Sequence, residues 1–307
     1  MKFRAKLAGC LALLVSPAAL YPGADDHGDG VVPIRIGAST SLVGADVNAT
    51  DARAALVVWS DALSRGTGIR VEHLPEVMSP PDQLYQRIRQ GDLDVFACSV
   101  AEYLHVVSYT DPGLVLIDQS YADGGEQYLI LTHVDSGIRS VSDLRGRSLS
   151  RYSANAMTLA PDWLETVLAG LNLGPSANFF KQMTQNPKAA RAVLPVFFRQ
   201  EDACLVNRRA FDSLTEMNPQ LAVKLRIIAA SPKIVPILVA VHKNCSALQK
   251  ERLQSALTAM NRNAGGRQIL TLFGSKGLIA VRPAVLDSAI EIIKASTRPS
   301  KMLATKD

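Results

Sequence analysis

From residue 34 onward, short apolar runs alternate with segments of helical periodicity, and this alternation limits the possible folds more than any other feature. The apolar runs predict strands over 32–37, 69–71, 93–98, 128–132, 147–152, 202–206, 225–229 and 235–241. The intervening segments predict helices over 79–91, 100–107, 159–171, 189–198, 246–262, 267–273 and 283–295, with an earlier helix that begins at Thr50 or Asp51. Such alternation is typical of α/β domains with largely parallel sheets.

The length and composition of the chain allow two lobes of ordinary size. It has 307 residues, of which 48% are hydrophobic and 20% are charged. These values are close to the average for globular proteins and exclude a disordered chain. We find no internal repeat that would indicate a solenoid or propeller.

The first residues have the pattern of a secretory signal peptide. A basic start is followed by an apolar run over 7–14 and by small residues at Ser16 and Ala18. The apolar run is much shorter than the roughly 20 residues that span a bilayer. We therefore expect residues 1–18 to be a cleaved signal peptide and residues 19–30, which are polar and rich in glycine, to be a flexible lead-in.

Cysteine usage and charge give further limits. Cys10 ends a lipobox-like Leu-Ala-Gly-Cys that precedes the apolar run instead of following it, so a lipoprotein is the less favoured alternative. Cleavage after residue 18 lowers the net charge from +5 to +2, which does not indicate a nucleic-acid partner. Cys98, Cys204 and Cys245 remain, an odd number, so at least one thiol is free or paired with another chain.

Residues 128–147, YLILTHVDSGIRSVSDLRGR, resemble the segment that opens the second lobe in periplasmic solute-binding proteins of the phosphonate and phosphite type. The resemblance covers about residues 31–295 and implies an α/β, two-lobed type II periplasmic-binding-protein fold with two hinge crossovers. Lobe 1 would comprise 31–122 and 234–307, and lobe 2 would comprise 123–233. The crossovers are expected near 118–127 and 230–235, where a hinge would let the lobes close on a ligand.

Ligands of open α/β sheets bind beyond the carboxyl ends of the strands, where backbone N–H groups favour an anion. In the first lobe this rule selects residues after two predicted strands. Hydroxyl groups there can donate to an oxyanion without a buried counter-charge. The candidates are Ser39, Thr40, Ser41, Cys98, Ser99 and Tyr103.

In the second lobe the candidates follow the resemblance as well as the strand ends. The family usually has Ser-Thr-Ser-Gly where this chain has residues 153–156, Ser-Ala-Asn-Ala, so hydroxyl donors and a glycine are lost. Asp202 could accept a hydrogen bond from the ligand, although an acid at a strand start more often has a structural role. The candidates are Tyr128, Ser153, Asn155, Thr158, Asp202 and Cys204.

Cysteine at position 98 allows an alternative function. Thiolates bind soft metals, and trivalent arsenic has a similar affinity for sulfur. The resemblance includes arsenite-sensing proteins that signal to a histidine kinase, and in such a sensor Cys98 would bond the metalloid. Cys98 and Cys204, expected on opposite lobes near the mouth of the cleft, could also form a disulfide that closes the lobes, which the sequence does not decide. A third alternative is a protein whose lobes scaffold a partner and bind no small molecule.

The sequence lacks the motifs of hydrolases, nucleotide-binding enzymes and dehydrogenases, and no His/Asp/Glu set has metal-ligand spacing. We therefore expect no enzyme activity, no cofactor and no resident metal. The predicted function is capture of a small oxyanion in the periplasm, for a membrane ABC permease or a sensor histidine kinase.

Overall fold

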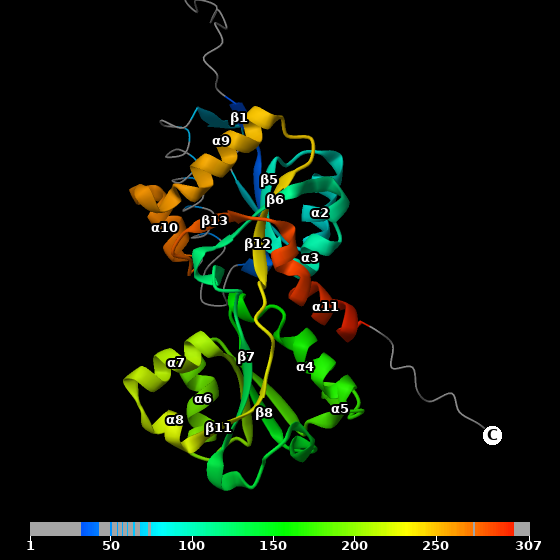
Figure 1. Ribbon diagram of the computed structural model, residues 1–307, viewed down its shortest axis with the longest axis vertical. Helices are drawn as coiled ribbons and strands as arrows, with labels where there is room; N and C mark the ends of the chain where they lie inside the picture. Colours follow the sequence, from blue (N-terminus) through cyan, green and yellow to red (C-terminus); the bar gives the residue numbers. More distant parts are fainter. Residues whose placement is uncertain are drawn as a thin grey trace, which may run out of the picture.

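The computed structural model describes residues 32–42, 68–72, 75–272 and 274–297, together with single positions 50, 54, 57, 60 and 64. The expected signal peptide (1–18) and lead-in (19–30) lie outside these residues. Positions 50, 54, 57, 60 and 64 are helical, in the region of the helix expected from Thr50 or Asp51. Within the described part of the chain, two α/β lobes lie one above the other along the long axis of the molecule (Figure 1).

The upper lobe in Figure 1 is built on a six-stranded sheet in the order β13-β6-β12-β5-β2-β4. Its strands are β2 (Ile36–Ser39), β4 (Glu76–Met78), β5 (Val95–Ser99), β6 (Thr110–Asp118), β12 (Ile237–His242) and β13 (Leu278–Val281). Its helices are α2 (Pro81–Gln90), α3 (Val100–Leu104), α9 (Ala247–Thr258), α10 (Ala264–Leu272) and α11 (Asp287–Ser296). A separate parallel pair joins β1 (Val32–Ile34) to β3 (Ile69–Val71).

Side chains of this sheet point alternately to its two faces, which separates the core into two clusters. Phe96 and Val115 pack with α2 residues on one face. Their neighbours Val95 and Leu116 pack with residues of α9 and α10 on the other. Strands buried on both faces read as continuous apolar runs, which is why the sequence shows β5 and β12 so clearly.

The lower lobe has a five-stranded sheet in the order β11-β7-β10-β8-β9. Its strands are β7 (Tyr128–His133), β8 (Ser148–Tyr152), β9 (Gln182–Asn186), β10 (Ala203–Asn207) and β11 (Leu225–Ala230). Its helices are α4 (Ala160–Gly170), α5 (Ser176–Phe179), α6 (Ala189–Phe197), α7 (Arg208–Met217) and α8 (Gln220–Lys224). The 3-10 segments of the two lobes are η1 (Thr40–Leu42), η2 (Val107–Tyr109), η3 (Gln119–Tyr121), η4 (Val134–Ser136), η5 (Val141–Leu144), η6 (Asn155–Met157), η7 (Met260–Arg262) and η8 (Pro283–Leu286).

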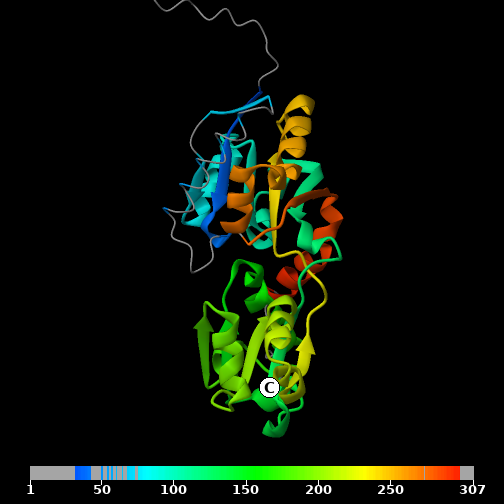
Figure 2. The same cartoon turned by 90° about the vertical axis from the view of Figure 1, so that its left-hand side faces the viewer.

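Two connections join the sheets, from β6 to β7 and from β11 to β12, and Figure 2 shows them between the lobes. They pair at a single bridge, in which Glu126 N donates to Ile234 O at 2.6 Å and Ile234 N donates to Glu126 O at 2.8 Å. Gly125 has φ +110, and a Cβ there would lie 2.1 Å from Ile234 O, so this close approach of the two connections requires glycine.

The predicted two-lobed fold with two hinge crossovers is confirmed. The predicted lobe limits after residues 122 and 233 fall inside these connections and remain a prediction.

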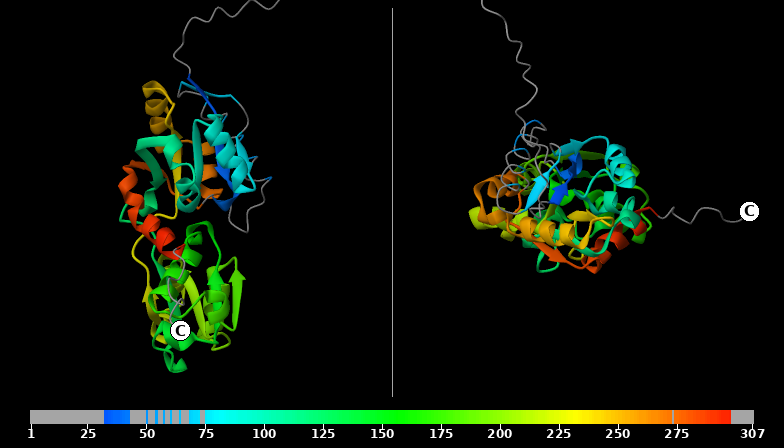
Figure 3. Two further views of the ribbon diagram at one scale, coloured as in Figure 1. Left: turned by 90° about the vertical axis from the view of Figure 1, so that its right-hand side faces the viewer. Right: turned by 90° about the horizontal axis from the view of Figure 1, so that it is seen from above.

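Helix α11 reaches from the upper lobe onto α4 of the lower lobe, as the two side views of the molecule show (Figures 2 and 3). Thr166 Oγ1 donates to Ile292 O at 3.2 Å, and Ser296 Oγ donates to Asp162 Oδ1 at 3.0 Å. The buried Ile292 belongs to the same core cluster as Trp163 of α4. The C-terminal helix therefore adds a third link between the lobes.

The sheets differ from the prediction in one respect. We expected largely parallel sheets, but five of the ten strand pairings are antiparallel. The strands next to the crossovers cause this difference: β6 and β12 pair antiparallel with each other, as do β7 and β11.

Some elements were not predicted. The sequence analysis missed β4, β6, β9, β13, α5, α7 and α8, and it predicted β1 and β2 as one strand.

Candidate functional site

A cavity of about 380 Å³ lies between the lobes, next to the hinge. From the upper lobe it is lined by small or apolar residues of β2 and β5, among them Gly37, Ala38 and Ala97. Most of its polar residues come from the hinge and the lower lobe: Ser120, Tyr121, Glu126, Tyr152, Asn155, Asn207, Arg209 and Ser213. Asp118, at the end of β6, and Ser275 of the upper lobe also line it. Both lobes and the connection between them therefore contribute to one cavity, as a closing binding protein requires.

Two buried carboxylates line the hinge side of the cavity. Glu126 is 2% exposed, and its Oε2 accepts from Asn207 Nδ2 at 2.8 Å while its Oε1 accepts from the Gln127 amide at 3.1 Å. Asp118 is also buried, and its Oδ1 accepts from the Ser120 amide at 2.6 Å. Burial raises the pKa of Tyr121, which lies beside them, and the negative charges of Glu126 and Asp118 raise it further. This part of the wall is rich in hydrogen-bond acceptors.

Asn207 ends β10 and is the N-cap residue of α7. An asparagine in this position normally accepts a hydrogen bond from a backbone amide of the first turn. Here the side chain makes no such bond, and its Nδ2 donates to Glu126. Asn207 Oδ1 is buried and accepts no hydrogen bond from the described residues.

Arg209, in the first turn of α7, brings positive charge to the same cavity. It donates from Nη1 to Ser120 Oγ at 2.7 Å and from Nη2 to Ser120 O at 3.0 Å, and it lies over the Tyr121 ring at 5.5 Å. The first turn of α7 holds no acidic residue. The helix dipole and the guanidinium thus both favour an anion at this part of the rim.

The serines that we predicted as anion ligands form a separate cluster around Glu102. The Glu102 carboxylate accepts from Ser39 Oγ at 2.5 Å, from Ser41 Oγ at 2.7 Å, and from the amide and hydroxyl of Ser99 at 2.8 and 2.9 Å. Ser39, Ser99 and Glu102 are all buried. Among the described residues, no cationic side chain lies within 4.0 Å of this carboxylate, so hydroxyl and amide groups provide the contacts that stabilise it.

The sequence analysis missed Glu102, although it carried a signal. Ser99-Val100-Ala101-Glu102 has the spacing of a capping box, and the structure shows both of its reciprocal bonds at the start of α3. The same carboxylate also accepts hydrogen bonds from the hydroxyls of Ser39 and Ser41 at the end of β2. This is possible because β2 and β5 are parallel neighbours whose carboxyl ends lie together. Sequence spacing indicates the first contact but cannot reveal the second.

The other predicted residues fall into two groups. Asn155 lines the cavity, and its Oδ1 accepts from the Ala156 amide at 2.8 Å. Tyr128 supports that loop from beneath: its side chain is fully buried and its hydroxyl donates to Ala156 O at 2.9 Å. The remaining residues, Thr40, Tyr103, Ser153 and Thr158, do not line the cavity. Tyr103 is buried and accepts from Thr110 Oγ1 at 3.2 Å, and Thr158 Oγ1 lies 3.5 Å from Pro236 O.

Asp202 has the structural role that the sequence left open. It lies immediately before β10, and its Oδ2 accepts from the amide and hydroxyl of Ser148 at 2.9 and 3.0 Å. Arg147 Nη1 lies 3.6 Å from its Oδ1. Since β8 and β10 are parallel and both start here, Asp202 lies at the edge of the sheet opposite to the cavity.

The cysteines do not lie at the mouth of the cleft, contrary to expectation. Cys98 and Cys204 are fully buried in separate core clusters, and Cys98, Cys204 and Cys245 are all free thiols. Burial raises the pKa of Cys98 well above that of an ordinary thiol, and the Glu102 charge raises it further. Burial likewise raises the pKa of Cys204. Neither side chain offers an accessible thiolate.

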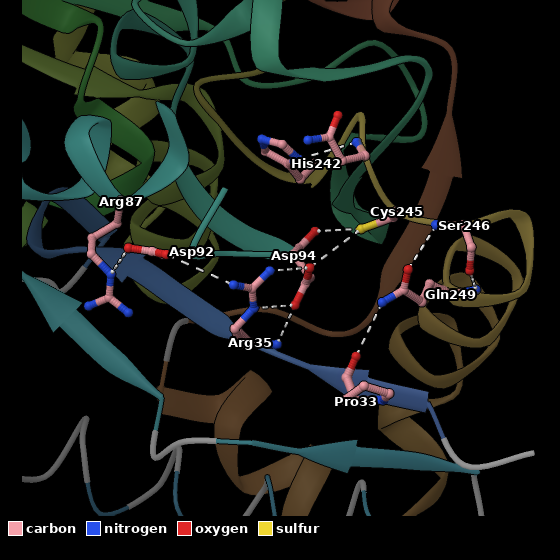
Figure 4. Close-up of polar contacts among 10 residues, drawn as sticks. Pro33, Arg35, Arg87, Asp92, Asp94, His242, Cys245, Ser246 and Gln249 are labelled. Atoms are coloured by element: carbon pink, nitrogen blue, oxygen red, sulfur yellow. Dashed lines mark hydrogen bonds and ion pairs between the residues drawn. The ribbon is translucent and has the colours of Figure 1, made fainter. Parts of the chain in front are cut away.

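A second polar network lies at the other edge of the upper sheet (Figure 4). Asp94 Oδ2 accepts from Arg35 N at 2.8 Å and Arg35 Nε at 2.9 Å, while its Oδ1 accepts from Arg35 Nη2 at 2.9 Å. Cys245 Sγ lies 3.5 Å from Asp94 O, at the start of α9. Arg35 and Asp94 precede β2 and β5, so this network joins the amino ends of the strands and stabilises the edge remote from the cavity.

In the described part of the chain, no group of three or more His, Cys, Asp or Glu residues is arranged to hold a metal ion. Nor is any described helix both long and apolar enough to cross a membrane.

Comparison with known proteins decides the family. The sequence matches the family of ABC transporter, phosphonate, periplasmic substrate-binding proteins over residues 43–286. The chain belongs to this family. Its members are the substrate-binding components of ABC transporters, a class of proteins that are not enzymes. No curated protein matches the sequence.

Solved structures share the fold of this phosphonate-family chain. A binding protein of an ABC phosphonate transporter from Pseudomonas aeruginosa is 18% identical, with a TM-score of 0.54 and 85% coverage of both chains. A Xanthomonas citri protein bound to ATP is 16% identical, with a TM-score of 0.59 and coverage of 86% and 96%. PhnD1 from Prochlorococcus marinus, in complex with methylphosphonate, is 17% identical, with a TM-score of 0.52 and coverage of 85% and 97%.

Proposed function

We propose that this protein captures a small organic oxyanion of the phosphonate type in the cavity between its lobes. The observation that carries the proposal is the cavity itself, which takes its walls from the upper sheet, the hinge and the start of α7. A solute there contacts both lobes and can therefore favour the closed arrangement over the open one.

The contacts of α7 support the anionic character of the ligand. Arg209 lines the cavity from the first turn of α7, which holds no acidic residue. A phosphonate oxygen near this turn would meet the guanidinium and the positive end of the helix. The apolar walls from β2, β5 and β12 suit the organic substituent of such a ligand.

This proposal assigns the anion to α7 and not to the predicted serines. The hydroxyls of Ser39, Ser41 and Ser99 already donate to Glu102. An external oxyanion would have to displace a carboxylate that belongs to the same chain. Of the residues predicted from sequence, Asn155 lines the cavity and is assigned to the binding site.

For the partner, we propose a membrane ABC permease that receives the solute, after export of the chain and cleavage of residues 1–18. Family membership supports a permease over a sensor histidine kinase. No contact in the structure favours arsenite sensing through Cys98, since its thiol has no exposed surface.

Calorimetric titration of the mature, reduced protein tests the proposal, with methylphosphonate, phosphite, phosphate, sulfate and arsenite as ligands. We expect binding of at least one phosphorus oxyanion, and Arg209→Ala should weaken it by about tenfold or more, because a charge-assisted hydrogen bond is lost. Arg191→Ala, an exposed change on α6, is the matched control. Binding of none of these anions, or equal affinity in Arg209→Ala, contradicts the proposal.

A further inference from the structure

The contact of α11 with α4 lies on the opposite side of the hinge from the cavity. Figure 1 shows the two connections between the lobes, with α7 and α10 to their left and α4 and α11 to their right. Helices α7 and α10 contribute residues to the cavity, among them Ser213 and Leu270, whereas no residue of α4 or α11, which the structure describes in full, lines it. A rotation about the connections that narrows the cavity therefore moves α11 and α4 apart.

The centre of this contact is apolar and buried. Ile292 of α11 is 5% exposed and Trp163 of α4 is 3% exposed, and both belong to one core cluster. Helix α11 also contacts α3 of the upper lobe, so it is attached to its own lobe while it packs against the other. Separation of α11 from α4 would expose apolar surface to water, which is unfavourable. The contact therefore stabilises the arrangement of the lobes in this structure.

The polar part of the contact can be released at low cost. Thr166 Oγ1, which donates to Ile292 O, also lies 2.9 Å from Asp162 O of its own helix. Ser296 Oγ, which donates to Asp162 Oδ1, also lies 3.0 Å from Ile293 O of its own helix. When the helices separate, both hydroxyls keep an acceptor, so neither is left without a partner. Such a contact can break and form again with each closure of the lobes.

We infer that the contact of Asp162, Trp163 and Thr166 with Ile292 and Ser296 is a reversible latch, which stabilises the wider arrangement of the lobes and must break when a ligand closes them. This inference rests on the proposed function and adds its regulation: a contact that the ligand never touches sets part of the affinity. The affinity observed for a ligand falls with the fraction of molecules in the binding-competent arrangement. A weaker latch raises that fraction and therefore tightens binding.

Ser296→Asp weakens the latch without removing apolar side chains from it. The new carboxylate is placed beside that of Asp162, and two like charges so close together repel each other. Thr297→Asp is the matched control, because it adds the same charge at the next position of the chain, which is exposed and donates to Ile293 O and Lys294 O of α11.

The spacing of the lobes gives a readout that needs no ligand. Nitroxide labels at Asp212→Cys of α7 and Gln268→Cys of α10, two exposed positions on the cavity side of the hinge, report the distance across the cavity by double electron–electron resonance. The native cysteines of the mature chain are buried, so the labels attach to the introduced ones. In ligand-free protein, Ser296→Asp should gain a population at shorter distance, and Thr297→Asp should not.

Ile292→Ala, which removes apolar surface from the latch, should change the distances in the same direction, and thermal unfolding checks that each variant is folded. A distance distribution that is unchanged in the folded variants, or that moves to longer distances, overturns the latch.

Titration with methylphosphonate, phosphite and phosphate separates the latch from the proposed function. We expect Ser296→Asp to bind at least one of these anions about fivefold more tightly than wild type does, and Thr297→Asp to bind it as wild type does. Unchanged affinity in Ser296→Asp overturns the effect of the latch on binding while leaving solute capture intact. Binding of none of the anions contradicts the proposed function, and the distances in ligand-free protein then decide on the latch.

Discussion

The hydroxyl of Ser39 donates a 2.5 Å hydrogen bond to the carboxylate of Glu102, 63 positions later in the chain. Ser39 is the last residue of β2, at the strand end where the sequence predicted an external oxyanion. In the structure, the hydroxyl groups at this position donate to a carboxylate of the protein itself, and their role in binding a solute stays a prediction.

Removal of the Glu102 carboxylate should lower stability. In Glu102→Ala, Ser39, Ser41 and Ser99 lose an acceptor that is buried with them, and α3 loses its capping box. We expect the free energy of unfolding to fall by about 2–4 kcal/mol, since each net hydrogen bond contributes about 1 kcal/mol. Urea unfolding followed by circular dichroism measures this change.

The control for this substitution is Glu76→Ala, whose carboxylate makes an exposed 3.4 Å ion pair with Arg87. It should change the free energy of unfolding by less than about 1 kcal/mol. Similar losses in the two variants would show that the cluster around Glu102 contributes little.

The buried thiols should be unreactive in the folded protein. Iodoacetamide reacts with thiolates, and burial raises the pKa of Cys98 and Cys204 above the ordinary value and keeps reagent away. Mass spectrometry after labelling at pH 8 should find both residues unmodified in native protein and modified in urea. Rapid labelling of native Cys98 would contradict its burial and would restore the case for a metalloid ligand.

Asp111 should make part of the stability depend on pH. Burial raises its pKa, but hydrogen bonds from Lys250 Nζ and the Gly113 amide outweigh this effect, so the pKa lies below its ordinary value of 3.8. A lowered pKa stabilises the fold above the ordinary value, and this contribution is lost as the pH falls through the native pKa.

We therefore expect Asp111→Asn to cost about 1 kcal/mol at pH 7, with a difference from wild type that shrinks as the pH falls below about 3.8. Urea unfolding across pH 3–7 measures it, with Asp212→Asn on the exposed side of α7 as the control. A difference that stays constant over this range would exclude an ionic contribution of Asp111.

The fold was largely predictable from sequence because most of its strands and helices are marked locally. Apolar runs identify β5, β7 and β12, and the helix α2 shows its proline start and ends at Gly91, which has φ +74. Polar β9 was missed because its side chains, QMTQN, lack both an apolar run and alternation. The mixed direction of the sheets was missed because strand direction depends on which strands pair within each sheet when the chain returns from the other lobe, which local patterns do not encode.

What the sequence determined by itself was therefore the α/β class, the two crossovers and the kinds of donor that follow the strands. Tertiary structure decided which of those donors are available. Glu102 accepts hydrogen bonds from Ser39 and Ser41 because two parallel strands, β2 and β5, end side by side. Asn207 donates to Glu126 because the chain returns to the hinge at the end of β10. A hydrogen bond depends on positions a few ångströms apart in space, and residues 63 or 81 positions apart become neighbours only when the chain folds.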